Sequence, residues 1–305
     1  MSNLPAPTDE RVEQATPKAR RRGLAGPVEQ RSRLQRLGKT ALLAIILLWC
    51  LYPFFWMIVT SLKMGDGALN DPDLFRGPFG WRNYTAVFAQ DFHLNLRNSA
   101  IVAGTTTIVC VVIGSLAAYA IARLPLKGRL GILTGILAVA LFPPVALVPP
   151  LYDLWRTLGW LNSYHGLVIP YTAFTLPLTI FILTTFFSSI PKDLEEAARV
   201  DGATPLQAFY KVVLPLAAPG VFAAAIIIFV QAWNEFLLAS TFAPRDLSVQ
   251  TVPVAIASFT GAVPFQRPIG TILAACVIVT VPMIVMALLF QRRIIAGLTA
   301  GGVKG

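Results

Sequence analysis

Six long stretches without a charged side chain constrain this chain more than any other feature of its sequence. Each is at least 23 residues long and contains no Asp, Glu, Lys or Arg. About 20 apolar residues suffice for a helix to cross the hydrocarbon core of a membrane. In lipid a backbone must satisfy its own hydrogen bonds, and most of these stretches lack the two-residue alternation of barrel strands. The sequence therefore predicts an all-α polytopic membrane protein with six transmembrane helices, over residues 40–62, 98–122, 130–152, 157–191, 212–234 and 268–291.

The distribution of basic residues predicts how the six helices are oriented. Only 13% of the 305 residues are charged, yet the net charge is +10. Of the 25 Lys and Arg residues, 18 fall on the side of the membrane that holds both termini and 7 on the opposite side. Because cytoplasmic loops carry the excess of basic residues, both termini are predicted to be cytoplasmic. Charge spread along helix flanks, with no module of aromatic and basic residues, argues against a nucleic-acid partner.

The same pattern divides the chain into three parts. Residues 1–39, rich in Pro, Arg, Gln and Glu, are predicted to be a mobile basic cytoplasmic arm. Residues 40–291 form the six-helix transmembrane domain, with its core over 98–291, and residues 292–305 form a glycine-rich cytoplasmic tail. A secretory signal is excluded because the first apolar run begins near residue 40 and ends without a small-residue cleavage site.

The sequence contains no set of residues typical of catalysis. Gly38-Lys39-Thr40 resembles the end of a phosphate-binding loop, but Arg33 stands at the position of the first glycine of such a loop. His93 and His165 are isolated, with no second His or Cys at ligand spacing, so neither metal chemistry nor a nucleophilic triad is indicated. We therefore expect a transport subunit that has no catalytic residues and binds no cofactor or metal of its own.

Prolines are frequent within the predicted spans, which suits a translocation pathway. Such interruptions are tolerated in membranes where neighbouring helices or a water-filled path satisfy the freed carbonyl groups. A kink that serves packing is the alternative for any one of them. The residues concerned are Pro143, Pro144, Pro149 and Pro150 in the third span, Pro170 and Pro177 in the fourth, and Pro282 in the sixth.

Glu235 is a charged residue with apolar sequence on both sides, at the end of the fifth span. A carboxylate deep in the membrane costs on the order of 2.5 kcal/mol or more on insertion scales, so it should face a cavity or a partner. Two interpretations stay open. Glu235 lines a solute pathway together with Gln231, Trp233 and Asn234, or it makes a hydrogen bond at the membrane interface or to another subunit.

A charged, alanine-rich segment at residues 191–215 separates the fourth and fifth spans. Pro191 can start a helix, and Gly202 allows the backbone to leave it. Thr204 can cap a second helix that has Pro205 at its first position. The first helix places Leu194, Ala197, Ala198 and Asp201 on one face, which the two alanines make flat. The sequence thus predicts a helix-turn-helix whose flat face is suited to docking in a groove of another protein.

The alternative for this segment is an amphipathic helix that lies on the membrane surface. Such a helix would carry more Lys, Arg and bulky apolar residues than this segment contains. The sequence therefore favours protein docking.

The residues of this segment resemble a known motif. Glu196-Ala197-Ala198 is followed after three residues by Gly202 and, further on, by Leu214-Pro215. This spacing is similar to the EAA loop in the permease subunits of binding-protein-dependent ABC importers, with Val212 in place of a frequent isoleucine. Residues 232–236 and 291–305 are similar to the MalG-type subunit of carbohydrate importers. The residues that the resemblance assigns to ATPase coupling are Glu195, Glu196, Ala197, Ala198, Asp201, Gly202, Ala203, Leu214 and Pro215.

The resemblance implies partners that this chain does not contain. They are a second, MalF-type permease, a dimer of ABC ATPase subunits that bind ATP and Mg, and an extracytoplasmic sugar-binding protein, all assembled at the lipid bilayer of a bacterial or archaeal cytoplasmic membrane. The turn Phe259-Thr260-Gly261-Ala262 is implied to contact the binding protein.

The resemblance also suggests a solute. The residues around 250–261 and the tail are most similar to permeases for trehalose, maltose and related α-glucosides. Glycerol 3-phosphate is an alternative solute. An ion-coupled secondary transporter is a further alternative, but it should carry paired ionisable residues within its spans, and apart from Glu235 there are none.

Overall fold

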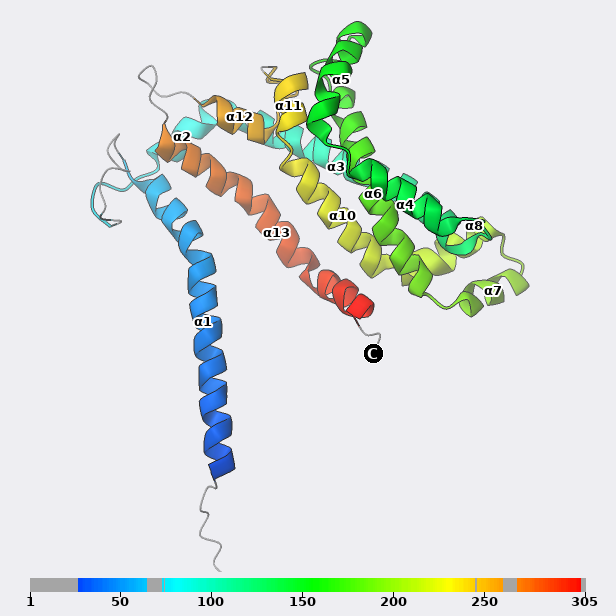
Figure 1. Ribbon diagram of the computed structural model, residues 1–305. Coiled ribbons are helices and arrows are strands. Elements are labelled where there is room, and N and C mark those ends of the chain that lie inside the picture. Colours follow the sequence, from blue (N-terminus) through cyan, green and yellow to red (C-terminus); the bar gives the residue numbers. More distant parts are fainter. Residues whose placement is uncertain (1–26, 65–72, 74, 245, 260–267, 303–305) are drawn as a thin grey trace, which may run out of the picture. The chain divides into compact units, whose positions relative to one another are not determined.

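The computed structural model describes residues 27–64, 73, 75–244, 246–259 and 268–302, and over these residues the chain is helical, with one isolated β-bridge between Lys63 and Phe79 (Figure 1). The chain divides into two compact units, Met1–Phe54 and Phe55–Gly305, and α1 (Pro27–Leu62) crosses the division. The sites described below all lie in the second unit.

Four helices are long and apolar enough to cross a membrane without interruption. They are Gln35–Leu62 within α1, α3 (Phe92–Arg123), α6 (Tyr164–Ser189) and Ile269–Phe290 within α13 (Ile269–Gly302). Two further pairs of helices pass the same test together but are sharply bent, so the described residues provide four spans, or six if each bent pair is one span. The first, second, fourth and sixth predicted spans are therefore found as single helices, and the third and fifth correspond to the two bent pairs.

The two bends occur at different local features. The third predicted span is divided between α4 (Arg129–Ala140) and α5 (Pro144–Leu158), which meet at 77° with Pro143 as the N-cap of α5. The fifth is divided at Ala217, where α10 (Ala218–Trp233) leaves the preceding helical stretch at 78°. The prolines at 149, 150, 170, 177 and 282 lie inside helices that continue past them. Only the pair at 143 and 144 therefore interrupts a span as predicted.

Two predicted boundaries differ from the helices in the structure. α1 begins at Pro27, inside the arm predicted over residues 1–39, and α13 continues to Gly302, through the tail predicted from residue 292. Both extensions lack an internal proline, and they therefore continue the apolar helices beside them. The remaining helices are α2 (Arg82–Phe88), α7 (Lys192–Val200), α8 (Pro205–Ala208), the π-helix η1 (Phe209–Val213), α9 (Leu214–Leu216), α11 (Leu237–Phe242) and α12 (Val252–Ser258).

α3 is the central helix of the second unit. It packs along α6 and α10, while α10 also contacts α13. At Gly114 the contact with α6 is so close that an added Cβ would lie 2.7 Å from Cγ2 of Thr179. Nearby, Sγ of Cys110 lies 3.1 Å from Oγ1 of Thr175. These short contacts join α3 and α6 over the middle of the span.

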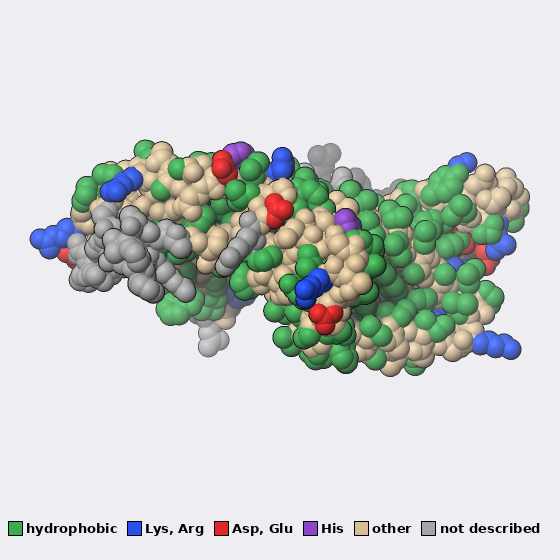
Figure 2. Space-filling model, turned by 90° about the horizontal axis from the view of Figure 1, so that it is seen from above, with side chains coloured by type: hydrophobic (Ala, Val, Ile, Leu, Met, Phe, Trp, Pro, Cys, Tyr) green, Lys and Arg blue, Asp and Glu red, His purple; other side chains and the backbone are tan. Residues whose placement is uncertain are grey.

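Large apolar side chains are exposed on the outside of the helices. Figure 2 shows hydrophobic side chains over much of the visible face, with charged side chains in small groups. Leu141, Leu130 and Leu289 are 85%, 78% and 71% exposed. Such extensive apolar surface is expected where a protein contacts lipid or other subunits.

Candidate functional site

The 191–215 segment forms the helix-turn-helix that the sequence predicts. α7 begins after Pro191, and Gly202 leaves it with a φ of +90°, in the left-handed region that favours glycine. Thr204 then caps α8 through a reciprocal capping box. The N–H of Gln207 donates to Oγ1 of Thr204 at 3.3 Å, and the N–H of Thr204 donates to Oε1 of Gln207 at 2.9 Å. Local sequence rules therefore account for the turn.

The second half of the segment differs from a plain α-helix. α8 passes directly into the π-helix η1, which continues into α9. Phe209, the first residue of η1, is buried between Tyr119 of α3 and Phe187 of α6, with ring centroids 4.7 and 5.9 Å away. π-Helical turns are rare and often occur at functional sites. The packing of Phe209 is a tertiary contact, and the sequence alone gave no signal for it.

The outer face of the segment is open. No residue of α7 is buried, and the exposed apolar side chains Val200, Leu206 and Leu194 are 87%, 59% and 46% accessible. Apart from its chain neighbours, no atom in the described part of the chain lies within 4 Å of the position that a Cβ on Gly202 would take. Of the other residues predicted for coupling, Glu196, Ala197, Asp201 and Pro215 are exposed, whereas Ala198, Ala203 and Leu214 are half-buried. Apolar groups among charges at an open surface suit a protein partner.

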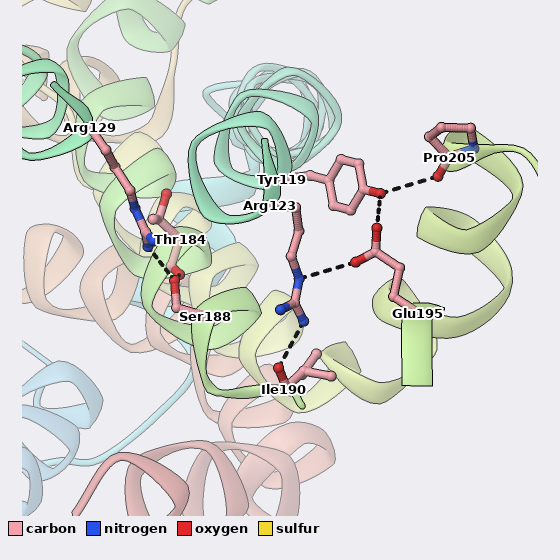
Figure 3. A network of polar contacts seen from close by, with 8 residues as sticks. All are labelled: Tyr119, Arg123, Arg129, Thr184, Ser188, Ile190, Glu195 and Pro205. Carbon is pink, nitrogen blue, oxygen red and sulfur yellow. Dashed lines mark hydrogen bonds and ion pairs between the residues drawn. The ribbon is translucent and has the colours of Figure 1, made fainter. Parts of the chain in front are cut away.

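The inner face of the segment is held by the end of α3 (Figure 3). The hydroxyl of Tyr119 donates to Oε1 of Glu195 at 2.6 Å and lies 3.2 Å from the carbonyl oxygen of Pro205. Nε of Arg123 lies 3.3 Å from Oε2 of Glu195, and its guanidinium also donates to the carbonyl of Ile190 at 2.9 Å. We call these five residues the ion-pair joint.

The ion pair of this joint is largely shielded from solvent. The side chains of Arg123 and Glu195 are 4% and 12% exposed, so water and salt screen their attraction less than at the surface. Glu195 and Glu196, adjacent in sequence, therefore have opposite surroundings. Sequence reasoning did not identify Tyr119 and Arg123. The pattern that could have identified them is their spacing of four residues, which places both on one face of a helix at the charged end of a span.

A second contact joins helices close to this joint. Arg129 at the start of α4 donates to Oγ of Ser188 in α6 at 2.6 Å, and the Ser188 hydroxyl donates to the carbonyl of Thr184 at 2.6 Å (Figure 3). The basic residues at this end of the spans therefore also serve as structural donors.

Glu235 has two partners in its own chain. Its carboxylate oxygens accept hydrogen bonds from the N–H groups of Leu238 and Ala239 at 2.8 and 3.0 Å, at the start of α11. These bonds satisfy two of the backbone N–H groups at the start of that helix, which have no partner within the helix. The side chain also lines a cavity of about 180 Å³. The cavity is lined by Pro144, Tyr171, Phe174, Thr175, Gln231, Ala232, Glu235 and Leu238.

The four residues predicted for the sugar pathway are not all at this cavity. Gln231 and Glu235 line it. Trp233 is buried and stacks on Phe229, with ring centroids 5.5 Å apart, while Asn234 is exposed and donates to a carbonyl of its own helix. The structure therefore brings together half of the predicted set, and the role of the cavity in transport stays a prediction.

The start of α3 is held by a buried network of amides. Nδ2 of Asn95 donates to the carbonyl and to Oε1 of Gln250 at 3.0 and 3.1 Å. Nδ2 of Asn98 donates to the carbonyls of Leu247 and Gln250 at 2.9 and 3.1 Å, and the N–H of Val252 donates to Oγ of Ser99 at 2.8 Å. We use the name amide joint for the six residues of this network, which are Asn95, Asn98, Ser99, Leu247, Gln250 and Val252.

The chain on either side of the amide joint is also ordered by local contacts. Before it, Ser248 donates through its N–H to Oδ1 of Asp246 at 2.9 Å, and the hydrogen bonds from Ser248 lower the pKa of Asp246. After it, Phe259 is 7% exposed and packs on Phe92 with ring centroids 5.6 Å apart. Phe259 is thus part of the interior. Thr260, Gly261 and Ala262 lie outside the described residues, so the contact of this turn with a binding protein stays a prediction.

Together these features define a class of protein: a multi-pass helical membrane protein that presents an exposed helix-turn-helix between its spans. Comparison with known proteins identifies the family. Residues 110–299 match the family described as binding-protein-dependent transport system inner membrane component. The chain belongs to this family. It is a permease subunit of the inner membrane that functions with other permease, ATPase and binding-protein components, and ATP is hydrolysed by separate subunits.

Individual relatives extend over most of the chain. The trehalose transport system permease protein SugB of Mycobacterium tuberculosis is 45% identical over 258 residues, which cover 84% of this chain and 93% of that protein. The trehalose/maltose transport system permease protein MalG of Thermococcus litoralis is 45% identical over 267 residues, which cover 87% of this chain and 94% of that protein. A bacterial ABC transporter that imports alginate has a similar fold, with a TM-score of 0.69 at 22% identity over 91% of this chain and 99% of that chain.

Proposed function

We propose that this protein is the permease subunit of an ATP-driven importer for a di- or oligosaccharide of the trehalose/maltose type. The observation that carries the proposal is 45% identity to permeases for trehalose and for trehalose/maltose, over 84% and 87% of the chain. Its partners are a MalF-type permease, a dimer of ABC ATPase subunits and an extracytoplasmic sugar-binding protein.

The 191–215 segment is proposed to dock in a groove of one ATPase subunit. Its exposed apolar side chains and the open space around Gly202 support this role. Closure of the ATPase dimer would then move the segment, and with it the spans to which it is attached, as a rigid body.

A second candidate solute follows from another relative. The sulfoquinovosyl glycerol transport system permease protein SmoH of Agrobacterium fabrum is 44% identical over 270 residues, which cover 86% of this chain. That solute carries a sulfonate, which the carboxylate of Glu235 would repel if the solute passed the cavity beside it. Neutral α-glucosides are therefore the favoured class.

Uptake of labelled solutes tests the proposal. A strain without this gene, and the same strain complemented, should be compared on trehalose, maltose, sucrose, sulfoquinovosyl glycerol and glycerol 3-phosphate. We expect trehalose or maltose uptake to be lost and restored. Loss of glycerol 3-phosphate or sulfoquinovosyl glycerol uptake alone would contradict the proposed solute class, and transport by the purified chain without an ATPase would favour an ion-coupled transporter.

The proposed orientation has its own test. Single cysteines introduced at Ser163 and Ser248 should react with an impermeant thiol reagent added to intact cells, because the basic-residue distribution places these positions outside. A cysteine at Ala203 should react only after the membrane is opened. The reverse labelling pattern would show that the termini lie outside the cell.

A further inference from the structure

We propose that α3 is a rigid link that transmits the state of the 247–252 segment, at one face of the membrane, to the 191–215 segment at the other. The proposal rests on the proposed function, in which an ATPase docks at the 191–215 segment. It assigns a positioning role to Tyr119, Arg123 and Ser99, which contact neither solute nor nucleotide.

The first observation is that α3 is uninterrupted. It contains 32 residues, which corresponds to a length of about 48 Å, and it has no proline. Every other spanning segment among the described residues contains an internal proline or a sharp bend. The prolines are Pro53, Pro170, Pro177 and Pro282, and the bends are 77° and 78°. Because prolines and breaks are the usual sites of helix bending, α3 is the span best able to move as one body.

The second observation is that both ends of α3 are fixed to segments that are distant in sequence. At its start, the amide joint attaches Asn98 to Leu247, which is 149 residues away. At its end, the ion-pair joint attaches Tyr119 to Glu195, which is 76 residues away. Figure 1 shows α2 and α12 beside the start of α3, and α7 and α8 beyond its other end.

The third observation is that the ion-pair joint contacts both helices of the 191–215 segment and the residue that precedes it. Arg123 contacts the chain before α7, at Ile190, and α7 itself, at Glu195, while Tyr119 reaches Pro205 at the start of α8. The covalent connections of the segment are to α6, which contains two prolines, and to α10, which begins at the 78° bend. A displacement of α3 is therefore transmitted to the segment more rigidly through the ion-pair joint than through the covalent connections to α6 and α10.

A link of this kind has a measurable consequence. Two sites that bias the same rigid element are energetically coupled, and the coupling is reciprocal. The proposed function places the contact with the binding protein at the turn that begins at Phe259, which follows the 247–252 segment through α12. Docking of a loaded binding protein at that turn should therefore raise hydrolysis by the ATPase subunits. Loosening either joint should reduce that stimulation without removing the parts that bind or hydrolyse ATP.

The test uses the whole transporter in lipid vesicles, with partner permease, ATPase subunits and binding protein. ATP hydrolysis is measured without binding protein and with trehalose-loaded binding protein, for wild type, Arg123→Ala and Ser99→Ala. We expect stimulation to fall by about fivefold or more in each variant, within the usual range of coupling factors, while unstimulated hydrolysis stays near wild type. Ile108→Ala, on the exposed side of the same helix, is the matched control and should keep full stimulation.

Two further measurements separate a link from a purely structural role. Arg123→Lys keeps the charge and should recover part of the stimulation lost in Arg123→Ala. The double variant Arg123→Ala with Ser99→Ala should lose no more than the worse single variant, because both cut the same route. If Arg123→Ala fails to assemble, Tyr119→Phe removes only a hydroxyl and provides the same test.

The outcomes distinguish this inference from the proposed function. The link would be overturned if stimulation is unchanged both in Arg123→Ala and in Ser99→Ala, even if the wild type imports trehalose. If Arg123→Ala fails to assemble, Tyr119→Phe takes its place in this comparison. The link would also be overturned if the losses of stimulation in the two single variants add fully in the double variant. A wild type that imports none of the sugars would contradict the proposed solute, and stimulation would then be measured with the solute that the binding protein does carry.

Discussion

The two ends of α3 are held in different ways. At its start, Asn98 donates hydrogen bonds to two backbone carbonyls in a site where Asn95, Asn98 and Ser99 are at most 2% exposed. At its end, one largely shielded ion pair, the hydrogen bond from Tyr119 to Glu195 and the hydrogen bond from Arg123 to the carbonyl of Ile190 hold a segment whose first helix has no buried residue. The contacts at the start of α3 are those of a folded core. The contacts at its end hold an exposed segment whose outer face is open to a partner protein.

The difference indicates where each kind of substitution should act. Buried amides that lose a partner mainly lower the free energy of unfolding, because the remaining donors and acceptors stay desolvated. Exposed residues of the 191–215 segment contribute little to folding, so changes there should affect transport while the protein still reaches the membrane. The predictions below test this division, from the largest expected effect to the smallest.

Gly202→Leu should abolish uptake while the amount of protein in the membrane stays normal. The φ of +90° costs an L residue about 1–2 kcal/mol, and among the described residues no atom beyond the chain neighbours lies within 4 Å of the new Cβ, so the fold tolerates the change. The side chain would instead meet the docked ATPase. Uptake, ATPase copurification and hydrolysis should be measured on the same membranes.

Gly159→Leu is the matched control for that variant. Gly159 also has a positive φ, of +70°, and among the described residues nothing beyond its chain neighbours lies within 4 Å of a Cβ added there, but it ends α5, away from the 191–215 segment. It should keep most of the uptake. Normal uptake in Gly202→Leu would show that the segment merely connects two spans.

Asn98→Leu should produce the largest loss of stability among these variants. It removes two hydrogen bonds to backbone carbonyls and one accepted from the hydroxyl of Tyr164 at 2.7 Å, in a fully buried site. We expect the free energy of unfolding to fall by about 3 kcal/mol, measured by thermal unfolding in detergent. Asn234→Leu, at an exposed asparagine, should change it little. Equal effects of the two variants would contradict the importance of the amide joint.

These contrasts also show what local sequence rules can predict. The turn at Gly202, Thr204 and Pro205 was predicted because its glycine, cap and proline act within a few residues. The predictions of six spans and of the EAA segment likewise rest on local composition and spacing. A carboxylate such as Glu235 was expected to have partners, and the structure provides two backbone N–H groups and a cavity.

The contacts that sequence reasoning missed are long-range or depend on packing. Tyr119 meets Glu195 across 76 residues, and periodicity along one helix cannot identify such a pair. The π-helix begins at Phe209 because that ring is buried between two other helices, which local propensity does not encode. Prolines alone did not indicate where a span is interrupted, since α6 continues past Pro170, where neighbouring helices can satisfy the freed carbonyl group.

Glu195→Ala should lower stability by a smaller amount than Asn98→Leu. It removes the acceptor of Tyr119 and the counter-ion of Arg123, a group that is 4% exposed but keeps its bond to the carbonyl of Ile190. We expect a loss of about 2 kcal/mol in the free energy of unfolding, since hydrogen bonds to charged groups contribute about 1.5–3 kcal/mol. No change in unfolding would show that the ion-pair joint is not formed in the protein.

Glu196→Ala should have the smallest effect and forms a matched pair with Glu195→Ala. Glu196 is exposed beside its half-buried neighbour, so its removal should leave thermal unfolding unchanged. Uptake should fall by about fivefold at most, because an exposed charge pair with the ATPase contributes only about 0 to 1 kcal/mol. Uptake should be measured at low and high ionic strength, since screening reduces the contribution of such a pair. A loss of stability equal to that of Glu195→Ala would mean that the two glutamates share one environment, and the contrast between the inner and outer faces of α7 would be wrong.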